Sequence, residues 1–192
     1  MAKYTQIPSD TFQRLQLNAG LLLSDFTPDT GAFEKTNIIG ATSGGVSFEA
    51  TPSYTDFGED IDNCPKNMME LKRLESWEVV ISGTMTTHDT AVAKKLIGAA
   101  DVNGTVVTPR NDLDETDFFD LWWVGDYSDE NDEKGGGFIA IKMLNALSTG
   151  GLKITSSDKA KGTFDFEFTA HYSNENPDTV PFIEYIKAGT AA

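Results

Sequence analysis

Alternation of apolar and polar residues predicts two long β-strands, each with one buried face. In residues 77–86 the apolar positions recur at every second residue: Trp77, Val79, Ile81, Gly83 and Met85. Residues 163–173 repeat this pattern with Phe164, Phe166, Phe168, Ala170 and Tyr172. A period of two residues is what a strand requires when one face packs on a core and the other meets water.

Shorter apolar runs bounded by glycine, proline or acidic residues predict further strands. They lie at residues 21–23, 38–42, 46–50, 105–107, 118–124, 138–143, 152–154 and 182–186. Gly44-Gly45 stands between two of these runs, which predicts a hairpin there. The run at 118–124 is apolar on both faces, as expected for a strand covered on both sides or lying in an interface.

One amphipathic helix is predicted at about residues 89–100. Asp89 is suited to cap its N-terminus, and one stripe carries the apolar residues Val92, Ala93, Leu96, Ile97 and Ala100. A single one-sided helix among many strands predicts a mainly β chain. We expect an antiparallel β-sandwich or barrel with this helix on its flank, as a single domain over residues 1–192.

The segment between the strands at 46–50 and 77–86 is expected to be a long loop at about residues 52–75. Hairpin loops are usually short, and a long loop normally has a function. This one carries six large apolar residues among its charges: Phe57, Ile61, Met68, Met69, Leu71 and Leu74. We therefore predict that these side chains are buried against another molecule.

Composition limits the partners of the chain. Its 192 residues hold 15 basic and 30 acidic residues, a net charge of −15, so the surface repels nucleic acid and anionic membranes. No apolar run is long enough to span a bilayer, and the N-terminus has no apolar signal core. A single cysteine excludes an internal disulfide framework. These features predict a soluble, folded, acidic protein from a reducing compartment.

Candidate catalytic and metal motifs find little support. Asp56-Phe57-Gly58 matches the magnesium triplet of kinases, but every other kinase motif is missing. Cys64 has no local sign of activation, and nothing in the sequence brings it to His88 or His171, so we expect no enzyme and no cofactor.

The acidic segment at residues 126–133 fails the EF-hand pattern, which requires glycine at its sixth position and glutamate at its twelfth. Counted from Asp126, these positions hold Asn131 and Gly137. A different cation site on Asp126, Asp129 and Asp132 stays open as an alternative, beside a plain solvated turn.

The chain as a whole resembles the major tail tube proteins of long-tailed, siphovirus-like bacteriophages. The resemblance rests on residues 40–48, the acidic insertion after them, the strand at 77–85, the helix at 89–100 and the late strand at 165–171. It implies a β-sandwich with a flanking helix, six copies in a ring, and rings stacked into a tube through which genomic DNA passes without specific binding.

Further expectations follow from the same resemblance. The loop at 52–75 would reach a neighbouring ring, and residues 182–192 would form a C-terminal arm that strengthens stacking. Partners would be further copies of the chain and other phage tail proteins. The protein would be assembled in the host cytoplasm and reside in the virion tail.

Two alternatives stay open beside this interpretation. The first is another virion or secretion-tube component, such as a tail terminator or the inner tube of a contractile system. The second is a calcium- or carbohydrate-binding β-sandwich module, which would be a stable monomer.

Overall fold

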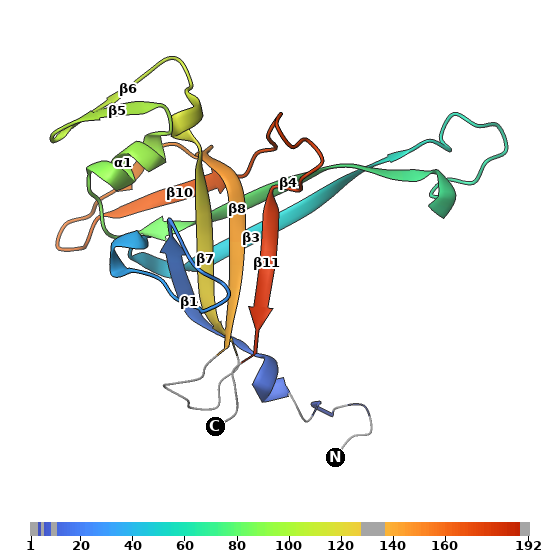
Figure 1. Cartoon of the computed structure of the whole chain (residues 1–192), viewed down its shortest axis with the longest axis horizontal. Coiled ribbons are helices and arrows are strands. Elements are labelled where there is room, and N and C mark those ends of the chain that lie inside the picture. Colours follow the sequence, from blue (N-terminus) through green and yellow to red (C-terminus); the bar gives the residue numbers. More distant parts are fainter. Residues whose placement is uncertain (1–3, 5, 9–10, 128–136, 189–192) are drawn as a thin grey trace.

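The protein folds as two layers of antiparallel β-strands that share one core. A computed structural model describes residues 4, 6–8, 11–127 and 137–188. The first layer has the strand order β2-β1-β7-β8, with β11 on the other side of β8. The second has the order β3-β4-β10, with β9 also paired to β10. The two layers join where Phe168 and Thr169 of β10 pair with β8, and their strands run across one another (Figure 1).

The strands have the following bounds. The first layer comprises β1 (Gln16–Leu23), β2 (Ile38–Gly40), β7 (Phe119–Tyr127), β8 (Gly137–Ser148) and β11 (Phe182–Lys187). The second comprises β3 (Thr42–Asp56), β4 (Lys72–Met85), β9 (Lys153–Thr155) and β10 (Thr163–Thr169). A separate small hairpin pairs β5 (Ala100–Asn103) with β6 (Val106–Pro109). Short 3-10 turns lie at Thr11–Arg14, Lys35–Asn37, Met69–Leu71 and Glu115–Asp117.

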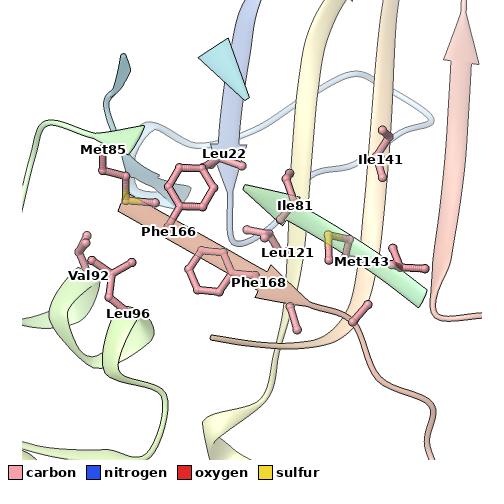
Figure 2. Packing of buried hydrophobic residues seen from close by; sticks show 13 residues of the cluster. Leu22, Ile81, Met85, Val92, Leu96, Leu121, Ile141, Met143, Phe166 and Phe168 are labelled. Carbon is pink, nitrogen blue, oxygen red and sulfur yellow. The ribbon is translucent and has the colours of Figure 1, made fainter. Parts of the chain in front are cut away.

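The core forms where the inner faces of the two layers meet the helix (Figure 2). Leu22, Leu121 and Met143 come from the first layer, and Val79, Ile81, Phe166 and Phe168 from the second. All of these side chains are buried. For the four of the second layer, the alternation in residues 77–86 and 163–173 predicts this burial. The predicted class, a mainly β antiparallel sandwich with one flanking helix, is confirmed.

The helix α1 (Thr90–Ile97) begins where the sequence predicts. The Asp89 carboxylate accepts a hydrogen bond from the backbone N–H of Val92 at 2.8 Å, as an N-cap does. The helix ends earlier than predicted, because Gly98 adopts φ +84 and the chain then enters β5 at Ala100. Val92 and Leu96 are buried in the core, so the predicted stripe packs on the sheet.

The predicted hairpin at Gly44-Gly45 is wrong. The segment before it, β2, pairs with β1, whereas β3 pairs with β4. Gly44 and Gly45 both have φ above +80 and sit in a bulge, where β3 advances from Thr42 to Val46 while β4 advances from Met85 to Gly83. Two successive positive φ angles suit glycine in a bulge as well as in a turn, so the glycine pair alone does not distinguish them.

Residues 182–186 are predicted both as a strand and as the start of a C-terminal arm, and the structure confirms the strand. Residues Phe182–Lys187 form β11, which pairs with β8 from Met143 to Phe138. Phe182 lies 5.7 Å from Phe48 and 5.6 Å from Trp77, measured between ring centroids, so the strand is fixed to the body by aromatic packing. Residues 189–192 lie outside the described residues.

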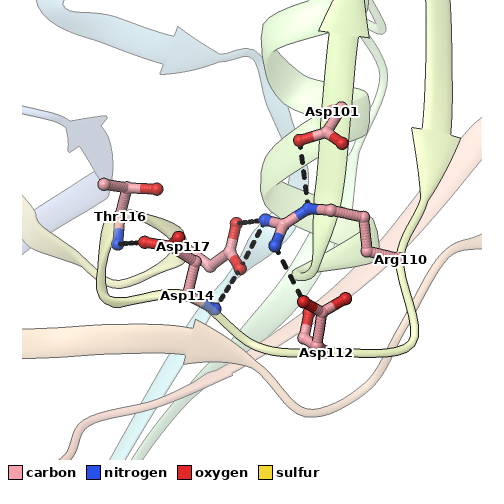
Figure 3. Close-up of polar contacts among 6 residues, drawn as sticks. All are labelled: Asp101, Arg110, Asp112, Asp114, Thr116 and Asp117. Atoms are coloured by element: carbon pink, nitrogen blue, oxygen red, sulfur yellow. Dashed lines mark hydrogen bonds and ion pairs between the residues drawn. The ribbon is translucent and has the colours of Figure 1, made fainter.

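The acidic segment after β6 is organised by one arginine (Figure 3). Arg110 donates from Nη2 to both carboxylate oxygens of the buried Asp117, at 2.6 and 2.7 Å. Its Nε lies 3.0 Å from Asp101 of β5, and its Nη1 donates to the carbonyl of Asp112. This network ties the β5–β6 hairpin to the start of β7, so part of the negative charge of the segment has a structural role.

Candidate assembly surface on the β3–β4 hairpin

The feature most suited to contact another molecule is the outer half of the β3–β4 hairpin. The two strands stay paired from the body of the protein out to Asp56 and Lys72. The predicted loop at 52–75 is therefore too long, since its first five and last four residues belong to these strands. The remaining tip, residues 57–71, stands far from the body (Figure 1).

This outer half has no sheet on either side within the described part of the chain. The other neighbour of β4, β10, pairs only with residues 80–85, and β3 is the last strand of its layer. The hairpin beyond Trp77 is thus a two-stranded ribbon with no further strand on either edge in the described residues. Isolated two-stranded ribbons are marginally stable in water, and open edges invite pairing with another chain.

One face of the ribbon continues the core face of the sheet. Pro52 and Tyr54 follow Phe48 and Ala50 at every second position of β3, and Trp77 pairs with Pro52. The register then shifts, because Ser53 pairs with Ser76 while Tyr54 pairs with Leu74. Glu75 is the extra residue of this bulge, and its insertion places Leu74 instead of a carboxylate beside Tyr54.

The outer end of this apolar face is not covered. Tyr54 is 52% exposed and Leu74 is 43% exposed, whereas Val79 and Ile81 on the same face are buried. Tyr54 is a contact candidate that sequence reasoning missed. The alternation of Phe48, Ala50, Pro52 and Tyr54 would have revealed it had the strand been extended beyond Ala50.

The base of the ribbon is held firmly. The backbone N–H of Trp77 donates to the hydroxyl of Tyr172 at 2.9 Å. The Trp77 ring also packs edge-on against Phe182 of β11. These contacts fix the direction in which the hairpin leaves the body.

The tip is an ordered turn built around Asp56. The Asp56 carboxylate accepts hydrogen bonds from the backbone N–H groups of Gly58 and Asn67, at 2.9 and 2.8 Å. These two bonds hold the pKa of Asp56 below its ordinary value. Phe57 N–H donates to the Leu71 carbonyl and closes the turn. The Asp-Phe-Gly triplet therefore shapes the tip, and its likeness to a kinase motif is incidental.

The predicted contact residues divide into two groups. Phe57, Ile61, Met68, Met69 and Leu74 are exposed. Leu71 is half-buried inside the tip, where it and Cys64 crowd Gly58 so closely that a side chain there would displace them. Leu71 thus supports the tip from within. Burial of the exposed five against another molecule stays a prediction.

The residues considered for catalysis do not meet. Cys64 lies in the tip, with its Sγ 3.4 Å from the sulfur of Met68. His88 stacks on Phe164 in the body, and the Nδ1 of His171 lies 3.1 Å from the Asn145 carbonyl.

The described residues contain no group of three or more histidine, cysteine, aspartate or glutamate side chains placed to hold a metal. Of the cation site considered above, Asp129 and Asp132 lie outside the described residues, and Asp126 accepts a hydrogen bond from Asn18. No helix in the described ranges is both long enough and apolar enough to cross a membrane.

Comparison with known proteins gives structural neighbours only. No family model and no curated protein matches the chain. The fold is similar to a chain in the tail of an empty gene transfer agent particle of C6 symmetry, with a TM-score of 0.43, 10% identity, and coverage of 81% of this chain and 92% of that one. It is also similar to a chain from the virion of a native gene transfer agent particle, with a TM-score of 0.42, 8% identity, and coverage of 90% and 96%.

Both neighbours are chains of gene transfer agent particles, one of them from a tail. At TM-scores below 0.5, neither likeness assigns a function to this chain.

Proposed function

We propose that this protein is a non-enzymatic structural subunit of a phage-type tail that assembles through its β3–β4 hairpin. The observation that carries the proposal is the apolar face of the hairpin, which leaves the core and continues uncovered past Tyr54 and Leu74 to the tip. Exposed apolar side chains gathered on a protruding element are typical of an interaction site.

The most economical partner is a second copy of the same chain. A protruding hairpin that binds elsewhere on an identical subunit makes a heterologous contact, and such contacts generate closed rings or open stacks. The resemblance of the sequence to major tail tube proteins supplies the detail of the proposal: rings of six copies, stacked into the tail tube of a virion and joined there to other tail proteins.

The charge of the chain agrees with a conduit for DNA. A net charge of −15 repels phosphate groups, so a tube of such subunits would let DNA slide without adhering. An acidic surface also keeps free subunits apart until specific contacts form.

Removal of the tip tests the proposal. Residues 57–71 are replaced by Asn-Gly, a two-residue turn that can join the paired residues Asp56 and Lys72. The variant should keep the circular dichroism spectrum and cooperative unfolding of the wild type, because the core cluster contains no tip residue.

The readout is negative-stain microscopy and sedimentation over a range of protein concentrations. The wild type should form tubes or stacked rings of constant diameter, and the variant should stay as monomers or single rings. Tubes formed equally by both proteins, or a wild type that is monomeric at every concentration, would refute the proposal.

A further inference from the structure

A basic turn stands out on this acidic protein. We call residues 150–162, which contain β9 and the turn into β10, the basic turn. It carries Lys153, Lys159 and Lys161 against Asp158 alone, a net charge of +2 in a chain of net −15. Every residue of β9 is exposed, and within the described residues β9 pairs only with β10, so its outer edge is open.

The basic turn also exposes apolar side chains. Ile154 of β9 is 59% exposed, and the neighbouring Leu152 is 39% exposed. A short open strand that combines lysines with two large aliphatic residues offers both charge and apolar area to a partner.

The hairpin tip has the complementary character. Residues 57–71 hold four carboxylates, of Glu59, Asp60, Asp62 and Glu70, against Lys66 alone, a net charge of −3. The same segment exposes Phe57, Ile61 and Met69. Acidic and apolar groups on the tip thus match basic and apolar groups on the turn.

The two surfaces lie at opposite ends of the molecule. The strand β10 begins beside Met85, which is the end of β4 away from the tip. Fourteen residues of β4 separate that end from the tip, a span of about 45 Å at the usual rise of a strand. Figure 1 shows the tip and the turn into β10 at the two ends of the longest axis. A tip therefore reaches a basic turn only on another molecule.

We infer that the acidic tip of one copy docks on the basic turn of the next copy, with carboxylates against lysines and apolar tip residues against Leu152 and Ile154. This inference rests on the proposed function and names the receiving surface. Because donor and acceptor are different surfaces at opposite ends, the contact is heterologous and runs head to tail, and a contact of this kind can stack one layer of subunits on the next. Opposite charges would also set the orientation in which copies meet.

Charge reversal on each side tests the docking. One variant carries Glu59→Lys, Asp60→Lys and Asp62→Lys; a second carries Lys153→Glu, Lys159→Glu and Lys161→Glu; a third combines all six. Each of the first two should raise the critical concentration for assembly by about tenfold or more, because like charges then face one another. The combined variant should return to within about threefold of the wild type, and its net charge stays at −15 because the reversals cancel.

The outcomes distinguish a failure of the docking site from a failure of the proposed function. If the wild type assembles and loss of residues 57–71 abolishes assembly, but reversal of the three lysines has no effect, the docking site is wrong and the proposed function stands. If the combined variant folds and does not recover assembly, the pairing of these two surfaces is wrong. If the wild type never assembles, the proposed function itself fails.

Cross-linking gives a second readout. In a Cys64→Ser background, Asp60→Cys and Ser156→Cys place one thiol on the tip and one on the basic turn. Oxidation of assembled protein should yield a ladder of covalent oligomers, and each single-cysteine control should yield dimers at most. A double-cysteine protein that assembles and gives no ladder would overturn the docking.

Discussion

The exposed tip residues allow the strength of the proposed contact to be estimated. We consider the double variant Phe57→Ser and Met69→Ser, whose native side chains are 53% and 81% exposed. Full burial of a phenylalanine or methionine side chain contributes about 1.5–3 kcal/mol. The area still available on these two side chains therefore corresponds to about 2–4 kcal/mol per contact, or a rise of about 30- to 900-fold in the critical concentration for assembly.

The assay is the critical concentration measured by pelleting assembled protein. Circular dichroism and thermal unfolding should match the wild type, because exposed substitutions usually change stability by less than about 0.5 kcal/mol. A control variant, Val106→Ser with Leu113→Ser, removes apolar side chains that are 57% and 53% exposed elsewhere on the surface. A rise of less than about threefold for the tip variant, or an equal rise for the control, would refute the reasoning.

Three further predictions concern the ribbon, the tip and the helix. Deletion of Glu75 should leave Leu74 paired with Tyr54 but remove the extra twist of the bulge, so the subunit should fold normally and assemble poorly, as judged by circular dichroism and microscopy. Asp56→Ala should loosen the tip, which amide exchange should show as faster exchange there. Backbone hydrogen bonds lower the pKa of Asp56, so the stabilisation of the tip by the Asp56 carboxylate is complete above about pH 4 and fades on further acidification. Burial and the nearby Lys94 lower the pKa of Lys95 to about 8. The contact of its Nζ with the Phe119 ring, 3.5 Å to the centroid, is worth about 0.5–2 kcal/mol and offsets only part of that cost, so Lys95→Met should be more stable than the wild type at pH 7 in urea unfolding. This advantage should shrink between pH 8 and 10.5, where the unfolded wild type binds more protons than the folded protein.

The sequence predicts the core strands and the helix well because their signals are local. Phe166, Phe168, Val79 and Ile81 alternate with polar residues, and burial of one face follows directly from that period. The capping carboxylate of Asp89 is likewise a local feature, and it works as predicted.

The errors arise where pairing depends on distant segments. Gly44 and Gly45 favour positive φ, but whether they turn the chain back or form a bulge depends on which strand lies beside them. Residues 182–186 are predicted as a strand, but their pairing inside the body depends on the open edge of β8 and on the aromatic surface that Phe48 and Trp77 offer to Phe182. Neither condition is visible from the residues themselves.

The exposure of the hairpin also depends on pairing between distant segments. Its apolar residues are evident in the sequence, and their exposure is evident only once the register shows that β10 stops at Val80. The sequence pattern also does not predict the ordered turn around Asp56, since the hydrogen bonds of Asp56 to Gly58 and Asn67 join positions up to eleven residues apart.

Charge and apolar area have different parts in the proposed assembly. Two copies of a chain with a net charge of −15 repel one another in most orientations, which raises the cost of wrong contacts. In the proposed docking, the basic turn at one end of the molecule would relieve that repulsion for the acidic tip of another copy. Apolar burial of residues such as Phe57 and Met69 would supply most of the affinity, while charge would select the orientation. Specificity would arise as much from the rejected orientations as from the accepted one.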